Sequence, residues 1–270
     1  MTHVYAFANQ KGGVGKTTTV VNLAAVMADW GLRVLVVDID PQSNATTSLG
    51  LNARTLPVSI YEVLIGGCRP AEAIVHTAWT GLDLLPSAPA LAGATVDLNA
   101  LTAPRERAGR LQQVLAPVAG YDYLLIDAPP SLGILTVNSL VAAQSVIVPV
   151  QCEYLALEGL SQLMNTIRLI QRGLNPTLGL RGVVMTMFDK RTNLSQEVVA
   201  EVQRHFPRKI FRILIPRSVR VSEAPSYGEP VVFYSARSSG ALAYRVLAWE
   251  LLKHDGHAVD WTPPRQVLED

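Results

Sequence analysis

Short apolar runs rich in β-branched residues alternate along the chain with longer stretches of helical periodicity. Strands that are buried on both faces read as continuous apolar runs, and their alternation with helices is typical of a sheet covered on both sides. The pattern therefore predicts an α/β protein of three layers (α/β/α), with a mostly parallel, twisted sheet flanked by helices on both faces. The expected strands are residues 3–8, 33–40, 82–86, 121–127, 145–150, 182–188 and 211–216. The expected helices are residues 16–30, which Gly31 would end, 103–116, 157–172, 195–206 and 241–253.

The chain contains no internal repeat or linker that would divide it, so we expect one domain over residues 1–254. Residues 255–270 are polar and include two prolines, and we expect a loose tail there. The composition, 49% hydrophobic and 17% charged residues in a chain of 270, allows a large core and excludes a disordered protein. The sequence has no recognisable secretory signal and no apolar stretch of membrane-spanning length, so we expect a cytoplasmic protein without stable membrane association.

Charge is distributed unevenly along the chain. Residues 1–160 carry 8 Lys and Arg against 12 Asp and Glu, whereas residues 161–270 carry 15 against 10. The basic excess is strongest over residues 181–220, with 9 basic against 3 acidic residues. Such a surface could bind a polyanion, or it could simply be solvated, and the charge count leaves both open.

A glycine-rich segment, NQKGGVGKTTT at residues 9–19, stands between the first expected strand and the first expected helix. Glycines allow the backbone to approach phosphate oxygens closely, and a helix N-terminus adds free N–H donors. In that context Lys16 would reach the β- and γ-phosphates, and the Thr17 hydroxyl would bind Mg²⁺. The segment predicts a nucleotide site formed by Lys11, Gly12, Gly13, Val14, Gly15, Lys16, Thr17 and Thr18.

Acidic residues follow two other expected strands. Asp38 and Asp40 stand two positions apart at the end of one strand, and Asp127 ends the apolar run YDYLLI. Ligands collect at the carboxyl ends of strands in open α/β sheets, and carboxylates there could hold a hydrated metal ion or position a water. Turn or capping roles are the alternative for all three residues.

The segment KGGVGKTTT, with its extra lysine at Lys11, resembles the deviant Walker A motif of the ParA/MinD class of P-loop ATPases. DAPPSLGILTVNSL, residues 127–140, resembles the switch II segment of the same class. The resemblance implies a P-loop NTPase fold, ATP and Mg²⁺ as cofactors, and hydrolysis of ATP. It further implies that Lys11 acts across a dimer interface, Asp40 orients the attacking water, and Asp38 and Asp127 belong to the magnesium environment. Thr186 and Pro216 would lie near the adenine.

Residues 215–230, IPRSVRVSEAPSYGEP, are similar to a segment of ParA (Soj) proteins, which partition chromosomes and plasmids. This resemblance implies an ATP-dependent homodimer that binds double-stranded DNA without sequence preference and is therefore nucleoid-associated. It implies release by a ParB-type centromere-binding protein that stimulates hydrolysis. Arg191 and Arg220 match family positions tied to DNA binding, with support expected from Lys190, Arg217, Arg208, Lys209 and Arg245.

Two other functions remain open at this point. A MinD-like ATPase acting at the membrane surface would share the nucleotide site but needs a C-terminal amphipathic helix, which residues 254–270 do not resemble. A nucleotide-gated scaffold without turnover is the second alternative. The residues expected for hydrolysis are all present, which argues against the scaffold.

Overall fold

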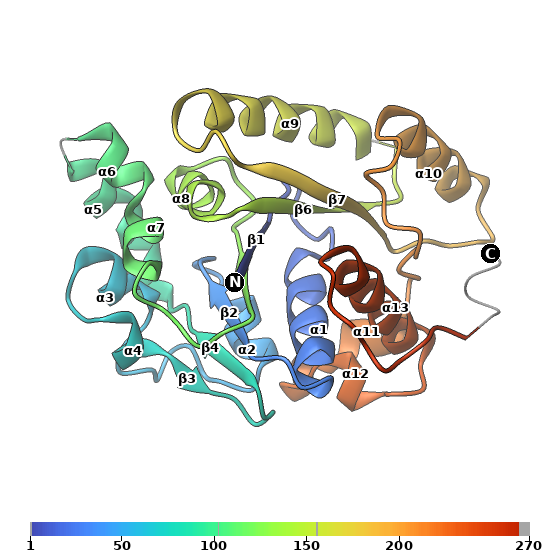
Figure 1. The fold of residues 1–270 in the computed structure, drawn as a ribbon, viewed down its shortest axis with the longest axis horizontal. Coiled ribbons are helices and arrows are strands. Elements are labelled where there is room, and N and C mark those ends of the chain that lie inside the picture. The colour runs from blue at the N-terminus through green and yellow to red at the C-terminus, as the bar shows by residue number, and fades with distance from the viewer. Residues whose placement is uncertain (1, 102, 155, 265–270) are drawn as a thin grey trace.

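The computed structural model describes residues 2–101, 103–154 and 156–264, and it confirms the predicted α/β fold. Over these residues, seven strands form one sheet in the order β3-β4-β2-β5-β1-β6-β7, in which only the β3–β4 pair is antiparallel (Figure 1). The strands are β1 (His3–Phe7), β2 (Val34–Asp38), β3 (Val75–His76), β4 (Leu82–Leu85), β5 (Tyr123–Asp127), β6 (Ser145–Gln151) and β7 (Gly179–Thr186).

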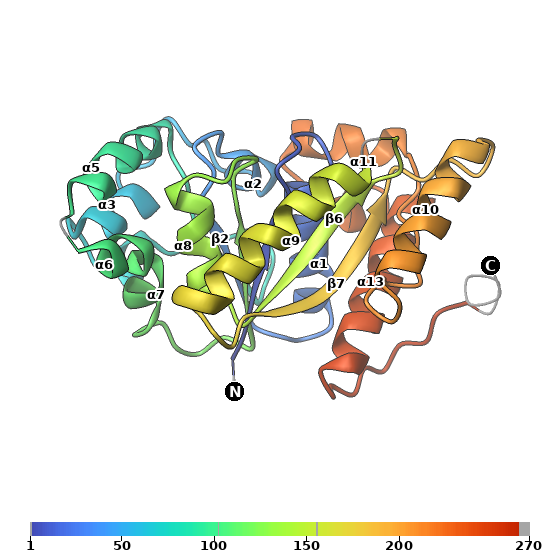
Figure 2. The ribbon, with the colours of Figure 1, turned by 90° about the horizontal axis from the view of Figure 1, so that it is seen from above.

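Helices cover both faces of the sheet, and Figure 2 shows α9 lying over β6 and β7 while α1 and α13 lie on the other side. One apolar core is shared by the sheet with α3, α5, α7, α8, α9 and α10, and a second core by the sheet with α1, α12 and α13. The helices are α1 (Lys16–Asp29), α2 (Asn44–Ser48), α3 (Ile60–Ile65), α4 (Pro70–Ala73), α5 (Ala94–Ala100), α6 (Pro104–Ala108), α7 (Arg110–Leu115), α8 (Ile134–Ala142), α9 (Ala156–Gly173), α10 (Asn193–His205), α11 (Val219–Glu223), α12 (Val231–Tyr234) and α13 (Ser239–His254), with 3₁₀ turns at Pro89–Gly93 and Ala224–Tyr227.

Helix α1 ends just before Gly31, as the sequence predicts. This glycine has a φ of 86°, in the left-handed region that favours glycine. Its N–H donates to Ala28 O, and the N–H of Leu32 donates to Met27 O, which is the Schellman arrangement. The chain therefore turns directly from α1 into β2, which places the residues after β2 beside the loop that precedes α1.

The prediction of a strand at residues 211–216 is wrong, because the structure describes all of these residues and has no regular strand there. The segment runs beside β7, with Phe211 N donating to Val183 O and Ile215 N to Met185 O, and isolated bridges pair Ile210 with Val183 and Pro216 with Phe188. Between these contacts, two backbone N–H groups bond to a side chain instead. The carboxylate of Glu250, on α13, accepts hydrogen bonds from Arg212 N at 2.9 Å and Ile213 N at 3.0 Å. Ile213 N stands between Phe211 N and Ile215 N, which donate to β7, so its bond to Glu250 interrupts the ladder at that point.

The helix predicted at residues 103–116 is broken between α6 and α7. The amide side chain of Asn138 lies at the break, donating to Arg107 O at 2.8 Å and accepting from Leu111 N at 2.9 Å. These bonds replace the helical partners of two backbone groups around Gly109. The short β3 and the shorter helices, α2 to α5, α8, α11 and α12, were not predicted.

The first part of the expected tail packs against the domain. The carboxylate of Asp255 is 5% exposed, pairs with Arg181 Nη2 at 2.6 Å and accepts from the hydroxyls of Tyr5 at 2.8 Å and Tyr123 at 3.0 Å. Further along, Trp261 lies against Trp30 with ring centroids 5.3 Å apart. Residues 265–270, the rest of the expected tail, lie outside the described residues. Within the described part of the chain, no helix is long and apolar enough to cross a membrane.

We expect Asp255→Ala to lower the free energy of unfolding by about 3 kcal/mol, because it leaves a largely buried guanidinium and two tyrosine hydroxyls without their acceptor. Denaturant unfolding of the nucleotide-free protein would measure this change. Asp260→Ala, which removes the same charge from an exposed position of the same segment, is the control. Equal effects of the two substitutions would contradict a stabilising role for the Asp255 contacts.

Candidate functional site

The candidate site lies where three neighbouring parallel strands end. β5 pairs with β1 on one side and with β2 on the other, so that its last residue, Asp127, is in register with both Phe7 and Asp38. The glycine-rich loop follows β1, and Asp40 follows β2. The three segments predicted to hold a nucleotide therefore meet at the carboxyl edge of the sheet, as expected for an open α/β sheet.

The glycine-rich loop has a backbone that only glycine adopts without strain at two positions. Gly13 has a φ of 74° and Gly15 a φ of 81°. Gly15 precedes α1, whose N-terminus has no side-chain cap among the described residues. The first N–H groups of this helix are thus available to a ligand, and the helix dipole favours an anion there.

Hydrogen bonds to β6 and β7 hold this loop in place. Asn9 donates from Nδ2 to Pro149 O at 2.7 Å, and its Oδ1 accepts from Lys11 N at 3.0 Å. Thr186, at the end of β7, donates from Oγ1 to Val14 O at 2.8 Å. The loop is therefore fixed by β6 and β7, and the Thr186 hydroxyl is already engaged with it.

Lys16 is the buried cation of the site, with only 6% of the residue exposed. Burial lowers the pKa of its ammonium group, and the negative charges of Asp127 and Asp40 oppose that shift. A buried ammonium close to two carboxylates is well suited to receive further negative charge, because it has given up most of its hydration in advance.

Asp127 and Thr17 form the candidate magnesium position. Thr17 Oγ1 donates to Asp127 Oδ2 at 2.6 Å, which leaves the oxygen lone pairs of the hydroxyl free to bind a metal ion. Asp127 Oδ1 is buried and has no hydrogen-bond partner among the described residues. Burial raises the pKa of Asp127, and the charge of Asp38 raises it further. A hydrated divalent cation fits here, since it would donate to the unpaired oxygen and favour the charged carboxylates.

Asp38 and Asp40 have different surroundings although they stand two residues apart. Asp38 is fully buried, and its Oδ2 accepts from Thr46 N at 2.9 Å and from Thr46 Oγ1 at 2.7 Å. Asp40 is 5% exposed, and its Oδ1 accepts from Gln42 N at 3.0 Å. Asp38 therefore fixes the segment that follows β2, while the carboxylate of Asp40 accepts a single hydrogen bond and lies close enough to Lys16 to affect its pKa.

Lys11 points away from the buried cluster in this single chain. Its ammonium group is 2.5 Å from Glu153 Oε2, and both side chains are about two-fifths exposed, at 41% and 43%. Glu153 in turn accepts from the amide of Gln151. The lysine is thus on the surface beside the loop, paired with a carboxylate of its own chain.

Thr186 and Pro216 line one cavity of about 200 Å³ beside the start of α1. Met187, which also lines it, has a φ of 53°, an unusual value for a residue that is not glycine. The structure thus brings both residues predicted near the adenine to a common hollow next to the phosphate loop. Strained backbone of this kind is often found at binding sites.

A second, basic cavity of about 590 Å³ adjoins the first, and Pro216 and Arg217 line both. Lys190, Arg191 and Arg217 surround it. The structure thus brings together three of the four residues in the predicted DNA-binding set.

The other predicted basic residues lie outside this cavity. Arg220 lies on α11 outside the cavity lining, where it donates to Glu223 Oε2 at 2.9 Å. Of the supporting residues, Arg245 pairs with Asp29 and Lys209 donates to Leu180 O, so both are engaged elsewhere.

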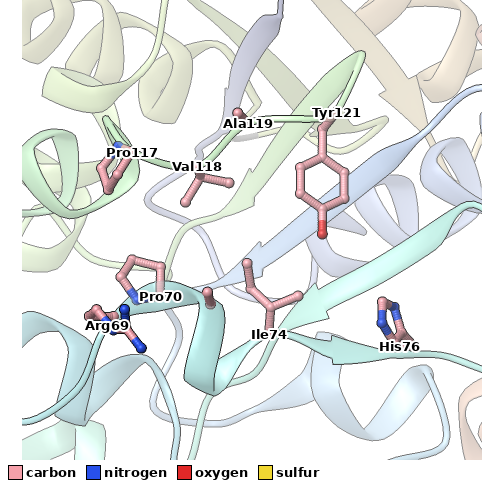
Figure 3. A pocket seen from close by; sticks show the side chains of 9 residues that line it. Arg69, Pro70, Ile74, His76, Pro117, Val118, Ala119 and Tyr121 are labelled. Carbon is pink, nitrogen blue, oxygen red and sulfur yellow. The ribbon is translucent and has the colours of Figure 1, made fainter.

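A third cavity, of about 550 Å³, lies apart from these sites, between α4 with β3 and the chain that leads into β5. Figure 3 shows Tyr121 and Val118 pointing into it from one side and Ile74 from the other. Asp83 accepts from Tyr121 Oη at 2.7 Å and lies 2.7 Å from His76 Nδ1. The described residues that line this cavity include none of the predicted site.

Sequence reasoning missed several residues that shape the site. Ser87 donates to Asp40 O at 2.7 Å, and its N–H donates to Thr46 Oγ1 at 2.9 Å. Thr46, Glu153 and Met187 were not singled out either. Ser87 and Met187 each follow closely after the carboxyl end of a strand of the parallel sheet. That position could have marked them as site residues, because ligands bind at this edge of such sheets.

The chain is similar over most of its length to curated proteins of known process. A family model described as an AAA domain matches residues 2–180. The sporulation initiation inhibitor protein Soj of Bacillus subtilis is 50% identical over 252 residues, which are 93% of this chain and 98% of that protein. The chromosome partitioning protein ParA of Myxococcus xanthus is 47% identical over 254 residues, 93% of this chain and 88% of that protein.

Solved structures show the same fold. A Mycobacterium smegmatis protein described as cobyrinic acid a,c-diamide synthase, with bound ADP and magnesium, has a TM-score of 0.83 and 41% identity over 98% of this chain and all of that one. The septum site-determining protein MinD of Pyrococcus horikoshii, complexed with Mg-ADP, has a TM-score of 0.75 over 95% of this chain and 98% of that one; its identity of 24% supports the fold alone.

Proposed function

The chain belongs to the Soj/ParA family of chromosome-partitioning ATPases, and from this membership we propose that it partitions DNA through a cycle of ATP binding and hydrolysis. It is a P-loop ATPase that uses ATP and Mg²⁺. In the proposed cycle, ATP favours a sandwich dimer that binds double-stranded DNA without sequence preference on the nucleoid. Hydrolysis, stimulated by a ParB-type centromere-binding protein, returns the chain to a form with weak DNA affinity.

The observation that carries the ATPase half of the proposal is the meeting of the glycine-rich loop, Lys16 and the Thr17–Asp127 pair at one edge of the sheet. The backbone N–H groups of residues 12–18 would hold the phosphates, and Lys16 would neutralise charge on the β- and γ-phosphates. Thr17 would ligate the metal directly, while Asp127 and Asp38 would act through water. Bound magnesium would supply charge neutralisation on the phosphate oxygens.

Two residues complete the proposed catalytic set. Asp40 would orient the attacking water, because its carboxylate accepts one hydrogen bond whereas that of Asp38 accepts three, and because Asp127 is already paired with Thr17 at the metal position. Lys11 would leave Glu153 and reach the phosphates bound by a second copy of the chain. Its exposed position beside the loop leaves it free for that movement.

The DNA-binding part of the proposal is supported by the basic cavity, which adjoins the cavity lined by Thr186 and Pro216. Arg191, Lys190 and Arg217 would bind backbone phosphates by charge, as would Arg220, and a dimer would present two such sets. Three curated relatives at 47–50% identity are described as a chromosome partitioning protein or as Soj. They are more similar to this chain than the M. smegmatis protein described as a synthase, which favours partition.

The proposal is tested by binding to duplexes of unrelated sequence, with ATP, with ADP and without nucleotide, over a salt series. We expect ATP-dependent binding that is indifferent to sequence. Arg191→Ala and Arg220→Ala should each weaken it for every duplex alike and reduce the salt slope by about 0.9 for each DNA phosphate that the variant no longer neutralises. The control is Arg204→Ala, an exposed arginine of α10 paired with Glu201 outside the basic cavity.

Absence of DNA binding in every nucleotide state would overturn the partition proposal while leaving the ATPase assignment intact. ATP-dependent co-sedimentation with liposomes would in that case support the membrane-positioning function. A ParB-type partner is tested separately, by whether its addition raises the rate of ATP hydrolysis in the presence of DNA.

A further inference from the structure

Arg191, the arginine proposed to bind DNA, is held by a carboxylate of its own loop. Its Nε donates to Asp189 Oδ1 at 2.9 Å and its Nη2 donates to Asp189 Oδ2 at 2.7 Å. Both donors on one edge of the guanidinium are therefore directed at the two oxygens of one anion. This is the fork geometry with which arginine also binds a phosphate group.

The Asp189 carboxylate is fixed where it stands. Its Oδ1 also accepts from Arg191 N at 3.0 Å, and its backbone carbonyl accepts from Thr192 Oγ1 at 3.0 Å. Its side chain is 21% exposed, whereas that of Arg191 is 82% exposed. The acid is thus part of the loop that leads into α10, and the arginine is the more exposed partner of the pair.

The electrostatic setting explains why this one acid matters. Lys190, Arg191 and Arg217 line the cavity, and Asp189 is the only acidic residue among the described residues that line it. Arg191 and Arg217 hold the pKa of Asp189 below its usual range, so the carboxylate stays charged at any pH at which the protein would meet DNA. The charge of the Asp189 carboxylate thus offsets one of the three positive charges that line the cavity.

We propose that Asp189 is a built-in competitor of DNA phosphate, which occupies the guanidinium fork of Arg191 and must be displaced when a backbone phosphate binds. This inference rests on the proposed DNA-binding function and adds a residue that sets its strength. Asp189 acts through Arg191, so it is a positioning residue and does not itself touch DNA. Its role is to keep DNA affinity low enough for release to follow the loss of ATP.

Asp189→Asn tests the proposal with little change in shape. The asparagine oxygen can still accept from Arg191 N, so the loop before α10 keeps its turn, while the charge that opposes phosphate is removed. We expect ATP-dependent DNA binding to tighten by about two- to fivefold for each arginine released. The salt slope should steepen by about 0.9 for each protomer, because one more uncompensated positive charge meets the DNA.

Two comparisons separate this mechanism from a general charge effect. Glu201→Gln removes an acid that is paired with Arg204 on the same helix but outside the cavity, and it should leave the slope unchanged. In an Arg191→Ala background, Asp189→Asn should change DNA affinity much less than in the wild type, since the guanidinium that the acid occupies is gone. Thermal unfolding of each variant checks that the fold is retained.

The outcomes are distinguishable. If the wild type binds DNA with ATP but Asp189→Asn binds no more tightly than Glu201→Gln, the competitor role is wrong and the proposed function stands. If Asp189→Asn tightens binding equally with and without Arg191, the acid acts by general charge and the inference is likewise overturned. If neither the wild type nor the variant binds DNA in any nucleotide state, the proposed function fails and the inference fails with it.

Discussion

Replacement of Lys16 by alanine is expected to reduce ATP hydrolysis by about 10²- to 10³-fold and to abolish ATP-dependent DNA binding. The ammonium group is buried, close to Asp127 and Asp40, and stands at the start of the helix whose N-terminus faces the proposed phosphates. Its removal takes away the positive charge that opposes the negative charge of the acidic cluster and of the bound phosphates. Nucleotide binding by equilibrium dialysis and phosphate release would measure the two steps separately.

The matched control for this change is Lys253→Ala. Lys253 is exposed near the end of α13, with its ammonium group 4.8 Å from the centre of the Trp249 ring, far from the proposed phosphates in the fold. Both variants lose one positive charge, so a general effect of net charge would appear in both. Hydrolysis by Lys16→Ala within twofold of the wild-type rate would contradict the assignment of this lysine to the phosphates.

The parts of the fold that local patterns determine were predictable from the sequence. The central strands are continuous apolar runs because they are buried on both faces. Gly31 ends α1 because its backbone adopts a positive φ, which glycine tolerates without strain. The glycine-rich loop was recognisable for the same reason, since the residues that shape it are consecutive. In each case the physical cause lies within a few residues of its effect.

The errors come from contacts between distant parts of the chain. Glu250 accepts hydrogen bonds from the N–H groups of residues 212 and 213, which are 37 or more positions away. Asn138 breaks the helix through its contact with Leu111, 27 positions away. Asp255 is fixed by Tyr5, Tyr123 and Arg181, which belong to three different strands. No local pattern reports such contacts, because each residue alone is compatible with a solvated position.

The same division applies to the candidate site. The sequence predicted which residues of the glycine-rich loop and the acidic strand ends meet at one edge of the sheet, but not their individual surroundings. The engagement of Asp38 by Thr46, and of the Thr186 hydroxyl by Val14 O, depends on register and on the meeting of separate strands. These contacts are what distinguish Asp40 from Asp38 as the carboxylate available for chemistry.

Asp40→Ala is therefore expected to slow ATP hydrolysis by about 10²- to 10⁴-fold while changing ATP affinity only a few-fold. Lys16, Thr17 and Asp127 are untouched by this change, so the proposed phosphate and metal contacts persist. Because hydrolysis is the step that would release DNA, ATP-dependent DNA binding should persist and its dissociation should slow. Single-turnover hydrolysis and dissociation of preformed DNA complexes with ATP would measure the two effects.

Asp40→Asn separates charge from shape in this prediction, since the amide oxygen can still accept from Gln42 N. If the carboxylate charge orients the water, the asparagine variant should hydrolyse ATP as slowly as the alanine variant. Asp29→Asn, at an exposed position at the end of α1, is the control for loss of one negative charge. Should Asp40→Asn retain near-wild-type turnover, the charge of Asp40 would not take part in hydrolysis, and its role would be reduced to holding the segment after β2.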